Sequence, residues 1–187
     1  MNKRVYLDHN ATTPLRAEAK AAMRDAMDVV GNPSSVHAEG RAAKAIVEKA
    51  RAKVAEAMGA GTADIVFVSG ATEAAALALA GRGLKASGLE HEAVLGWVDA
   101  TLPVVDGCVV VDDPDASVVQ LANSETGIIQ KLPEGLAVSD VTQAVGKLPL
   151  SYSWAGVEIM FLAGHKLAGR RGQARSSFLR VMICRPD

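Results

Sequence analysis

The sequence predicts an α/β fold in which helices flank a mainly parallel sheet. Alanine-rich stretches with helical spacing alternate with short runs of β-forming residues, as expected where helices cover both faces of a sheet. Each run ends in a polar or glycine-containing turn, and such turns gather at the carboxyl edge of a parallel sheet, where ligands bind. The four runs cover residues 65–68, 118–122, 136–138 and 159–162.

Three helices are predicted from the spacing of small and apolar residues. The first follows Thr12-Thr13-Pro14 and covers residues 16–30, with an apolar side made of Ala19, Ala22, Met23 and Ala26. The second covers residues 39–58 and ends at Gly59, and its apolar side consists of Ala43, Ile46, Val47, Ala50, Val54 and Ala57. A third, alanine-rich helix covers residues 74–80.

Composition narrows the class of protein. The 187 residues suffice for one domain, and 20 Lys and Arg against 21 Asp and Glu leave no net field that would attract nucleic acid or an anionic membrane. Apolar runs are too short for a membrane span and the N-terminus does not resemble a signal peptide, so we expect a soluble cytoplasmic protein. Cys108 and Cys184 lack metal-type spacing, so we expect reduced thiols and no metal site.

The turn at residues 69–73 joins the first predicted strand to the third helix. The amides of Ala71 and Thr72 would lie at the positive end of the helix dipole, where they can bind a phosphate. The same residues also fit a helix cap in which the carboxylate of Glu73 returns to the backbone. Both interpretations stay open, and they are compatible.

Polar side chains also follow the second and third runs. Asn123 opens the turn at residues 123–127, and Asp140 follows the third run with Gln143 three residues further on. A carboxylate can pair with a protonated ring nitrogen, and an amide can donate to a phenolic oxygen on the same ring, so Asp140 and Gln143 suit a pyridinium cofactor. An ordinary turn for Asn123 and an N-cap for Asp140 are the alternatives.

Gly164-His165-Lys166 follows the fourth run. A lysine at the end of a buried strand loses hydration, which favours the uncharged amine, so Lys166 is a candidate Schiff-base nucleophile. A solvated lysine that opens a loop is the alternative. His91 lies in a polar segment and is a candidate for stacking on a flat cofactor or moving a proton, whereas His9 and His37 are expected to be structural.

The order of these motifs resembles that of cysteine desulfurases of the class V aminotransferase fold. The resemblance extends over nearly the whole chain up to Ala168, with spacings compressed between His91 and Asp140. The matching segments are residues 7–14, 31–37, 69–73, 90–91, 123–127, 140–147 and 164–166. The resemblance implies that residues 1–168 are the incomplete large domain of a fold type I pyridoxal phosphate enzyme and that residues 169–187 are an off-family tail.

The resemblance also implies the cofactor pyridoxal 5′-phosphate and roles for single residues. Lys166 and His91 would be the catalytic residues: Lys166 would form the Schiff base, and both would move protons. His91 would also stack on the ring, Asp140 would pair with the pyridine nitrogen, and Gln143 would donate to the phenolate oxygen. The other implied cofactor contacts are Asn123, Gly164 and the phosphate ligands Ala71, Thr72 and His165.

The implied reaction transfers sulfur from L-cysteine, giving L-alanine and an enzyme persulfide. A sulfur-acceptor protein, in iron–sulfur assembly or another pathway of sulfur metabolism, and a homodimer are the implied partners. Two alternatives stay open. One is another class V aminotransferase or lyase with a different substrate, and the other is a non-catalytic remnant or partner subunit.

The chain departs from the family pattern at two positions and at its end. Ala163 stands where the family has a phosphate-binding serine, which should weaken cofactor affinity by about 1–3 kcal/mol, and Ser124 replaces an asparagine. After Ala168 the pattern of the next strand, the persulfide loop and the small domain is not recognisable, and neither cysteine matches that loop. We therefore expect an impaired enzyme with an unpaired sheet edge. We hypothesise that residues 170–187 arise from a one-base frame shift; a genuine basic tail is the alternative.

Overall fold

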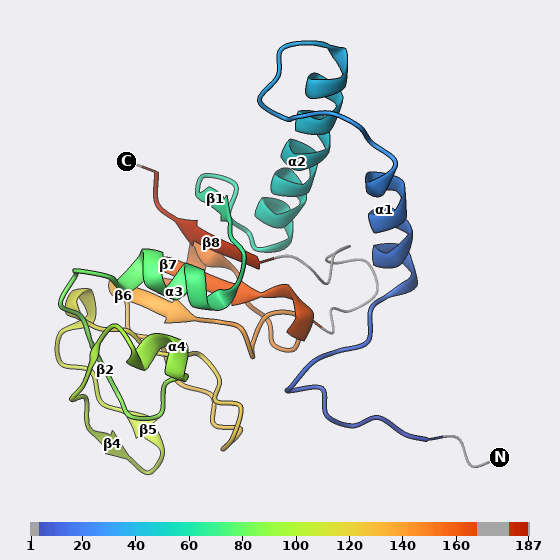
Figure 1. Ribbon diagram of the computed structural model, residues 1–187. Helices are drawn as coiled ribbons and strands as arrows, with labels where there is room; N and C mark the ends of the chain where they lie inside the picture. Colours follow the sequence, from blue (N-terminus) through green and yellow to red (C-terminus); the bar gives the residue numbers. More distant parts are fainter. Residues whose placement is uncertain (1–3, 168–179, 187) are drawn as a thin grey trace.

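A four-stranded mixed sheet forms the centre of the molecule (Figure 1). The computed structural model describes residues 4–167 and 180–186, and the strands lie in the order β1-β8-β7-β6. β6 and β7 are parallel, whereas β8 is antiparallel to both β7 and β1. β1, β6 and β7 therefore run in one direction, and the predicted α/β class is confirmed. The strands are β1 (Asp64–Phe67), β6 (Leu136–Asp140), β7 (Val157–Ala163) and β8 (Arg180–Cys184).

The long helices lie where the alanine-rich periodicity predicts them. His37 caps α2 by accepting a hydrogen bond from Gly40 N, and Gly59 ends it with a φ of 57°, which glycine adopts without strain. No helix in the described ranges is long and apolar enough to cross a membrane. The helices are α1 (Ala17–Met27), α2 (Ala38–Ala57), α3 (Ala71–Leu79), α4 (Glu92–Leu95), α5 (Tyr152–Ala155) and the 3-10 turns η1 (Pro114–Ala116) and η2 (Gly164–Lys166).

The predicted run at residues 118–122 lies beside β6 without forming a regular strand. Val118 makes a parallel bridge to Val138, and two further amides of the run donate to β6 carbonyls at 3.1 and 2.9 Å. The run therefore extends the parallel part of the sheet. The short strands β2 (Lys85–Ala86), β3 (Asp99–Ala100), β4 (Val104–Val105) and β5 (Cys108–Val109) form two separate small sheets nearby.

β8 corrects the expectation that the sheet lacks a strand after Lys166. It lies between β1 and β7, and Val181 and Ile183 are fully buried, so the unpaired edge expected at this point is wrong. Residues 168–179, which include much of the segment hypothesised to be frame-shifted, lie outside the described residues. The frame-shift hypothesis and the boundary at residue 168 stay predictions.

The two faces of the sheet pack against different helices. Successive side chains of a strand point to opposite faces. Phe161 packs with α3 and α4 in one apolar cluster, whereas Met160 and Leu162 pack with the end of α2 in the other. All three are at most 1% exposed. The sheet is thus a closely packed middle layer that fixes the position of the loops at its edge.

α1 and the beginning of α2 stand apart from this core (Figure 1). Ala19 is the buried residue of α1, so most of the apolar side predicted for this helix is not covered. Exposed apolar side chains continue beyond α1, where Val30 is 83% and Val36 is 87% exposed. By contrast, α3 buries Ala74, Ala75, Ala78 and Leu79 in the apolar cluster that contains Phe161 of the sheet.

Replacing Ile183 by alanine should lower the free energy of unfolding by about 2–4 kcal/mol, because it leaves a cavity in the middle of the sheet. Ile129→Ala is the matched control: Ile129 is 55% exposed, so its loss should cost less than about 1 kcal/mol. Urea denaturation followed by circular dichroism measures both values. Equally small effects of the two substitutions would contradict the central position of β8.

Candidate active site

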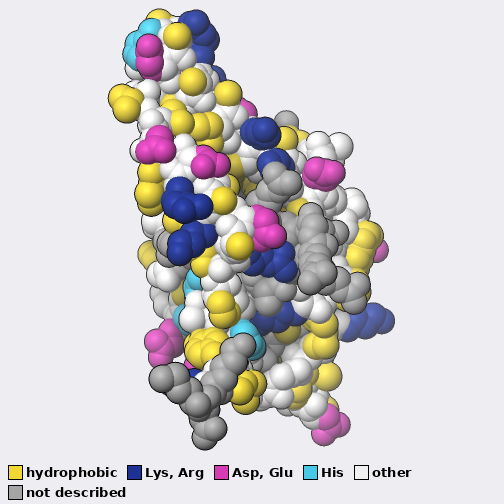
Figure 2. Space-filling view, turned by 90° about the vertical axis from the view of Figure 1, so that its right-hand side faces the viewer, with side chains coloured by type: hydrophobic (Ala, Val, Ile, Leu, Met, Phe, Trp, Pro, Cys, Tyr) yellow, Lys and Arg dark blue, Asp and Glu magenta, His cyan; other side chains and the backbone are white. Residues whose placement is uncertain are grey.

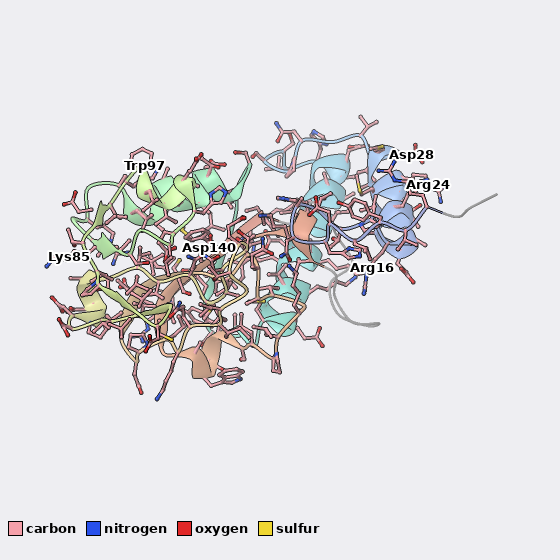
Figure 3. All side chains as sticks on the ribbon, turned by 90° about the horizontal axis from the view of Figure 1, so that it is seen from below. Arg16, Arg24, Asp28, Lys85, Trp97 and Asp140 are labelled. Atoms are coloured by element: carbon pink, nitrogen blue, oxygen red, sulfur yellow. The ribbon has the colours of Figure 1, made fainter. Side chains whose placement is uncertain are left out.

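Asp140 and Lys166 lie at the carboxyl ends of two neighbouring parallel strands. Asp140 ends β6 and pairs in register with Phe161 of β7, and Lys166 belongs to η2, the turn that directly follows β7 together with Gly164 and His165. Figure 3 shows Asp140 near the middle of the molecule, among converging loops. The pairing of β6 with β7 therefore brings the predicted ring partner and the predicted nucleophile to the same edge of the sheet.

The electrostatics of Asp140 show which charges it faces. The pKa of Asp140 is raised above its ordinary value, because desolvation of the carboxyl outweighs the hydrogen bond from Thr142 N to Oδ1 (2.8 Å) and the interactions with His91 and Lys166, which lower it. Asp140, His91 and Lys166 therefore form one electrostatic cluster. The cap-like turn that was the alternative role of Asp140 is also present, and it uses Oδ1.

His91 reaches this cluster from a different part of the chain. It caps α4, and its Nδ1 accepts a hydrogen bond from Ala93 N at 3.1 Å. The preceding turn is held by the side-chain amides of Gln120 and Asn123, which both donate to the carbonyl of Leu89. The cap and the turn together hold an exposed imidazole beside residues 118–122.

Asn123 is fully engaged with the protein. Its Oδ1 accepts hydrogen bonds from Glu125 N and Thr126 N, both at 2.8 Å, and its Nδ2 donates to Leu89 O at 2.9 Å. The side chain is 7% exposed. The turn-forming role predicted as the alternative is therefore present, and a contact with a cofactor stays a prediction.

Gln143 is oriented by two neighbours. Its Oε1 accepts a hydrogen bond from Lys147 Nζ at 2.6 Å, and its Nε2 donates to the carbonyl of Asn10 at 3.1 Å. Lys147 also donates to Asn10 Oδ1 at 3.3 Å, and burial and the charge of Lys166 lower the pKa of Lys147. No role was predicted for Lys147, although its position four residues after Gln143 could have suggested a contact between the two side chains.

The N-terminal arm connects the loops of the site. Thr13 donates to the carbonyl of His165 from both its backbone N (2.9 Å) and its Oγ1 (3.0 Å). Asn10 Nδ2 donates to the carbonyl of Ser124 at 3.3 Å. With the contact to Gln143, the arm therefore bonds to the loops that follow residues 118–122, β6 and β7.

Ala71 and Thr72 occupy the first turn of α3. Because β1 is parallel to β6 and β7, α3 begins at the same edge of the sheet as the cluster (Figure 1). Its N-cap Gly70 makes no side-chain hydrogen bond. The carboxylate of Glu73 accepts from Ser69 N, and its side-chain and backbone hydrogen bonds with Ser69 lower the pKa of Glu73. The returning carboxylate of the predicted capping box is therefore present, but no Ser or Thr side chain caps α3, because its N-cap is Gly70.

Glu90 belongs to the site, although the sequence analysis assigned it no role. It is 6% exposed, and its Oε1 accepts a hydrogen bond from Gln120 N at 2.7 Å. Burial raises the pKa of Glu90, and the charge of Asp140 raises it further. Its position directly before His91 was the one signal in the sequence.

The two histidines expected to be structural have structural contacts. His37 caps α2 and lies 2.9 Å from a carboxylate oxygen of Glu39. The ring of His9 packs edge-on against Tyr6, with 5.4 Å between the ring centroids.

Comparisons with known proteins show the family to which the chain and its fold are similar. The family model for aminotransferase class-V matches residues 5–100, just over half of the chain. A cysteine desulfurase from Frankia sp. is 36% identical, over 90% of this chain and 51% of the relative. A selenocysteine lyase from Xenopus laevis is 31% identical, over 91% and 55%. The crystal structure of a NifS-like protein from Rickettsia africae superposes with a TM-score of 0.79 and 27% identity, over 96% of this chain and 57% of that protein.

The chain belongs to the class V aminotransferase family. Its curated relatives are named cysteine desulfurases and selenocysteine lyases, and the chain spans about half the length of those it matches.

Thr13→Val should destabilise the chain by about 1 kcal/mol, because it removes a nearly buried hydrogen bond to the carbonyl of His165 while keeping the shape of the side chain. Thr12→Val is the matched control. Thr12 is exposed and its hydroxyl lies 3.4 Å from the same carbonyl, so its loss should have little effect. Urea titration measures the free energy of unfolding of both variants. A larger effect at Thr12 than at Thr13 would contradict the importance of the Thr13 hydrogen bond to His165.

Proposed function

We propose that this chain binds pyridoxal 5′-phosphate through a covalent link to Lys166 Nζ. The observation that carries the proposal is the cluster of Lys166, His91 and Asp140, which come from three separate parts of the chain, at the sheet edge where α3 begins. These elements offer an amine, a flat ring, a carboxylate and leading helix amides. The amine can bind the aldehyde of the cofactor, and the flat ring can stack on its aromatic ring. The carboxylate can pair with its pyridine nitrogen, and the helix amides can bind its phosphate.

The residues present fit this cofactor. Thr142 Oγ1 and Glu90 Oε2, which flank or approach Asp140, are buried and have no hydrogen-bond partner among the described residues. Buried polar atoms of this kind are rare in folded proteins and occur at ligand sites. Asp140 uses Oδ1 for its own turn, which leaves Oδ2 for a ring nitrogen. Ala163 provides no hydroxyl, so we expect the weakened phosphate binding stated above.

When bound, the cofactor supplies an electron sink for bond cleavage at the substrate. Lys166 would hold the cofactor and move the proton at the substrate Cα, and His91 would cover the ring and move a second proton. Asp140 would keep the ring nitrogen protonated. Gln143 would turn its Nε2 from the Asn10 carbonyl to the phenolate oxygen. The phosphate would be held by Ala71, Thr72 and His165, with Gly164 and Asn123 lining the site.

We infer L-cysteine as the substrate and sulfur transfer as the reaction. The Cβ–S bond of L-cysteine breaks, the sulfur bonds to an acceptor thiol as a persulfide, and the thiol proton is retained in L-alanine, so no external oxidant or reductant is needed. The names of the curated relatives support this inference. Cys108 and Cys184 lie in β5 and β8 rather than in loops, so we assign neither as the persulfide carrier. A sulfur-acceptor protein would take the sulfur onward, in iron–sulfur assembly or another pathway.

We also infer a homodimer that covers the exposed apolar surface of α1 and α2. Figure 2 shows apolar side chains over the upper part of one face, where these helices lie. A surface of this kind is expected to pack against another protein, and a second copy would remove both surfaces from water. The exposed apolar residues there include Met27, Val29, Val30, Val36 and Ile46.

The selenocysteine lyases among the relatives favour a second candidate substrate, L-selenocysteine. The two substrates differ in one atom and in the acidity of the leaving group. Parallel assays of alanine release from each amino acid distinguish the two candidates. A folded protein that binds the cofactor and releases alanine from neither would fit a non-catalytic subunit.

Purified wild-type protein mixed with pyridoxal 5′-phosphate should turn yellow and lose this colour on borohydride reduction, with the mass of the chain raised by one reduced cofactor. Lys166→Ala should abolish the covalent adduct, because no other amine is proposed to reach the aldehyde. Mass spectrometry of the reduced protein and its peptides measures the result.

Lys85→Ala is the control for the lysine substitution, since Lys85 is exposed and lies in β2, away from the cluster. It should keep the full adduct. A colourless wild-type protein, or an adduct that persists in Lys166→Ala, would contradict the proposed cofactor link.

Val36→Asp should shift the protein from dimer toward monomer, because it places a charge on the proposed interface. Val105→Asp, at a residue that is 57% exposed but lies in β4, should leave the dimer unchanged. Sedimentation velocity measures both. A wild-type monomer at micromolar concentration would contradict the inferred homodimer.

A further inference from the structure

Glu90 has a buried carboxyl of which only one oxygen has a hydrogen-bond partner among the described residues. Its Oε1 accepts from Gln120 N at 2.7 Å, whereas its Oε2 is buried without a partner among residues 4–167 and 180–186. An ionised oxygen without a donor is costly to bury, while a protonated oxygen is neutral. The geometry therefore favours a proton on Oε2.

Glu90 also acts as a substitute for a neighbouring strand. The amides on both sides of Gln120 donate to β6, so Gln120 N points to the opposite edge of residues 118–122, where Glu90 Oε1 receives it. Gln120 Nε2 donates to the carbonyl of Leu89 in the same turn. Because His91 directly follows, the hydrogen bond of Glu90 fixes the backbone that carries the imidazole.

Charged groups from several elements surround this carboxyl. Burial and the charge of Asp140, at the end of β6, raise the pKa of Glu90 to about 8, although the hydrogen bond from Gln120 N lowers it. Residues 118–122 carry no titratable side chain. Four other ionisable groups lie nearby. His91 and Lys166 interact with Asp140, and Lys147 interacts with Lys166. The fourth is Glu92 of α4, which is exposed.

We propose that Glu90 is a neutral acid in the cofactor site, a positioning residue that holds its proton on Oε2 and docks the turn carrying His91 onto residues 118–122. In this state, the carboxylate of Asp140 faces His91 and Lys166 without a second negative charge beside it. The role toward the cofactor rests on the proposed function, whereas the protonation of Glu90 is a property of the chain alone.

Glu90→Gln tests this role because a glutamine reproduces the neutral acid. Its Oε1 can accept from Gln120 N, and its Nε2 is a donor where Oε2–H would be. Glu92→Gln is the matched control, since it removes the same charge on the other side of His91 from an exposed position.

The first measurement is the stability of the cofactor-free protein against pH. The pKa of Glu90 is raised in the folded state, so between about pH 4.5 and 8 the folded chain binds one proton more than the unfolded chain, and stability falls as pH rises. The unfolding constant of wild type relative to Glu90→Gln should grow about tenfold per pH unit within this window and level off above it. Glu92→Gln should follow wild type.

The second measurement is the affinity for pyridoxamine 5′-phosphate, which binds without a covalent link to lysine. The proposal requires that the cofactor binds to the chain in which Glu90 is protonated. Wild type should therefore lose about tenfold in affinity relative to Glu90→Gln between pH 7 and 9, because the fraction of the chain with protonated Glu90 falls by that factor. At pH 7 the two proteins should bind within about twofold of each other.

A third measurement needs no variant. Carbon-13 NMR of wild type labelled at the glutamate carboxyl should show one resonance that titrates near pH 8. Titration of every glutamate below pH 6, or parallel stability profiles of wild type and Glu90→Gln, would overturn the neutral acid. Parallel affinity profiles would overturn its role toward the cofactor. If no protein binds pyridoxamine 5′-phosphate, the proposed function fails instead, and the stability and NMR data still decide whether Glu90 is protonated.

Discussion

The parallel register of β6 and β7 is the constraint on which the candidate site depends. It sets Asp140 opposite Phe161, so that both strands reach the same edge and Lys166 follows within one short turn. A shift of one residue would turn Asp140 to the other face of the sheet and move the buried Phe161 out of its cluster. Most of the paired side chains, including Leu136, Val138, Met160 and Phe161, are fully buried, so packing of the core also holds the register that brings Asp140 and Lys166 to one edge.

The N-terminal arm adds a second constraint, which acts on loops rather than on strands. Loops lose conformational entropy when they are ordered, so contacts that hold several loops at once help to define a site. From one short segment, Asn10 and Thr13 donate to the carbonyls of Ser124 and His165, and the Asn10 carbonyl accepts from Gln143 Nε2. Ordering the arm once therefore restrains several catalytic candidates together, and the present contact of Gln143 with Asn10 must be exchanged if Gln143 is to contact a cofactor.

The sequence was informative where a pattern is local. Helical spacing located α2, and polar residues after apolar runs located Asp140 and Lys166, because strand ends and turn chemistry depend on neighbours in the chain. β8 was missed because its place in the middle of the sheet depends on pairing with β1 and β7, which no local signal encodes. Glu90 was missed for the same reason, because its contact with Gln120 joins residues 30 positions apart. Lys147 contacts Asn10, 137 positions away, but its contact with Gln143 is local, so that part of its role could have been predicted.

A cap-type hydrogen bond and a role in a ligand site are compatible for Asp140 and His91, because each bond occupies one atom of the side chain and leaves another. The bond from Thr142 N fixes the carboxyl plane of Asp140 and uses Oδ1, so Oδ2 has one direction available. The bond from Ala93 N to His91 Nδ1 orients the imidazole and occupies Nδ1, so Nε2 is the other ring nitrogen. The cap-type bonds therefore restrict the orientation of both side chains before any ligand binds, which is the kind of preorganisation that the proposed cofactor site would need.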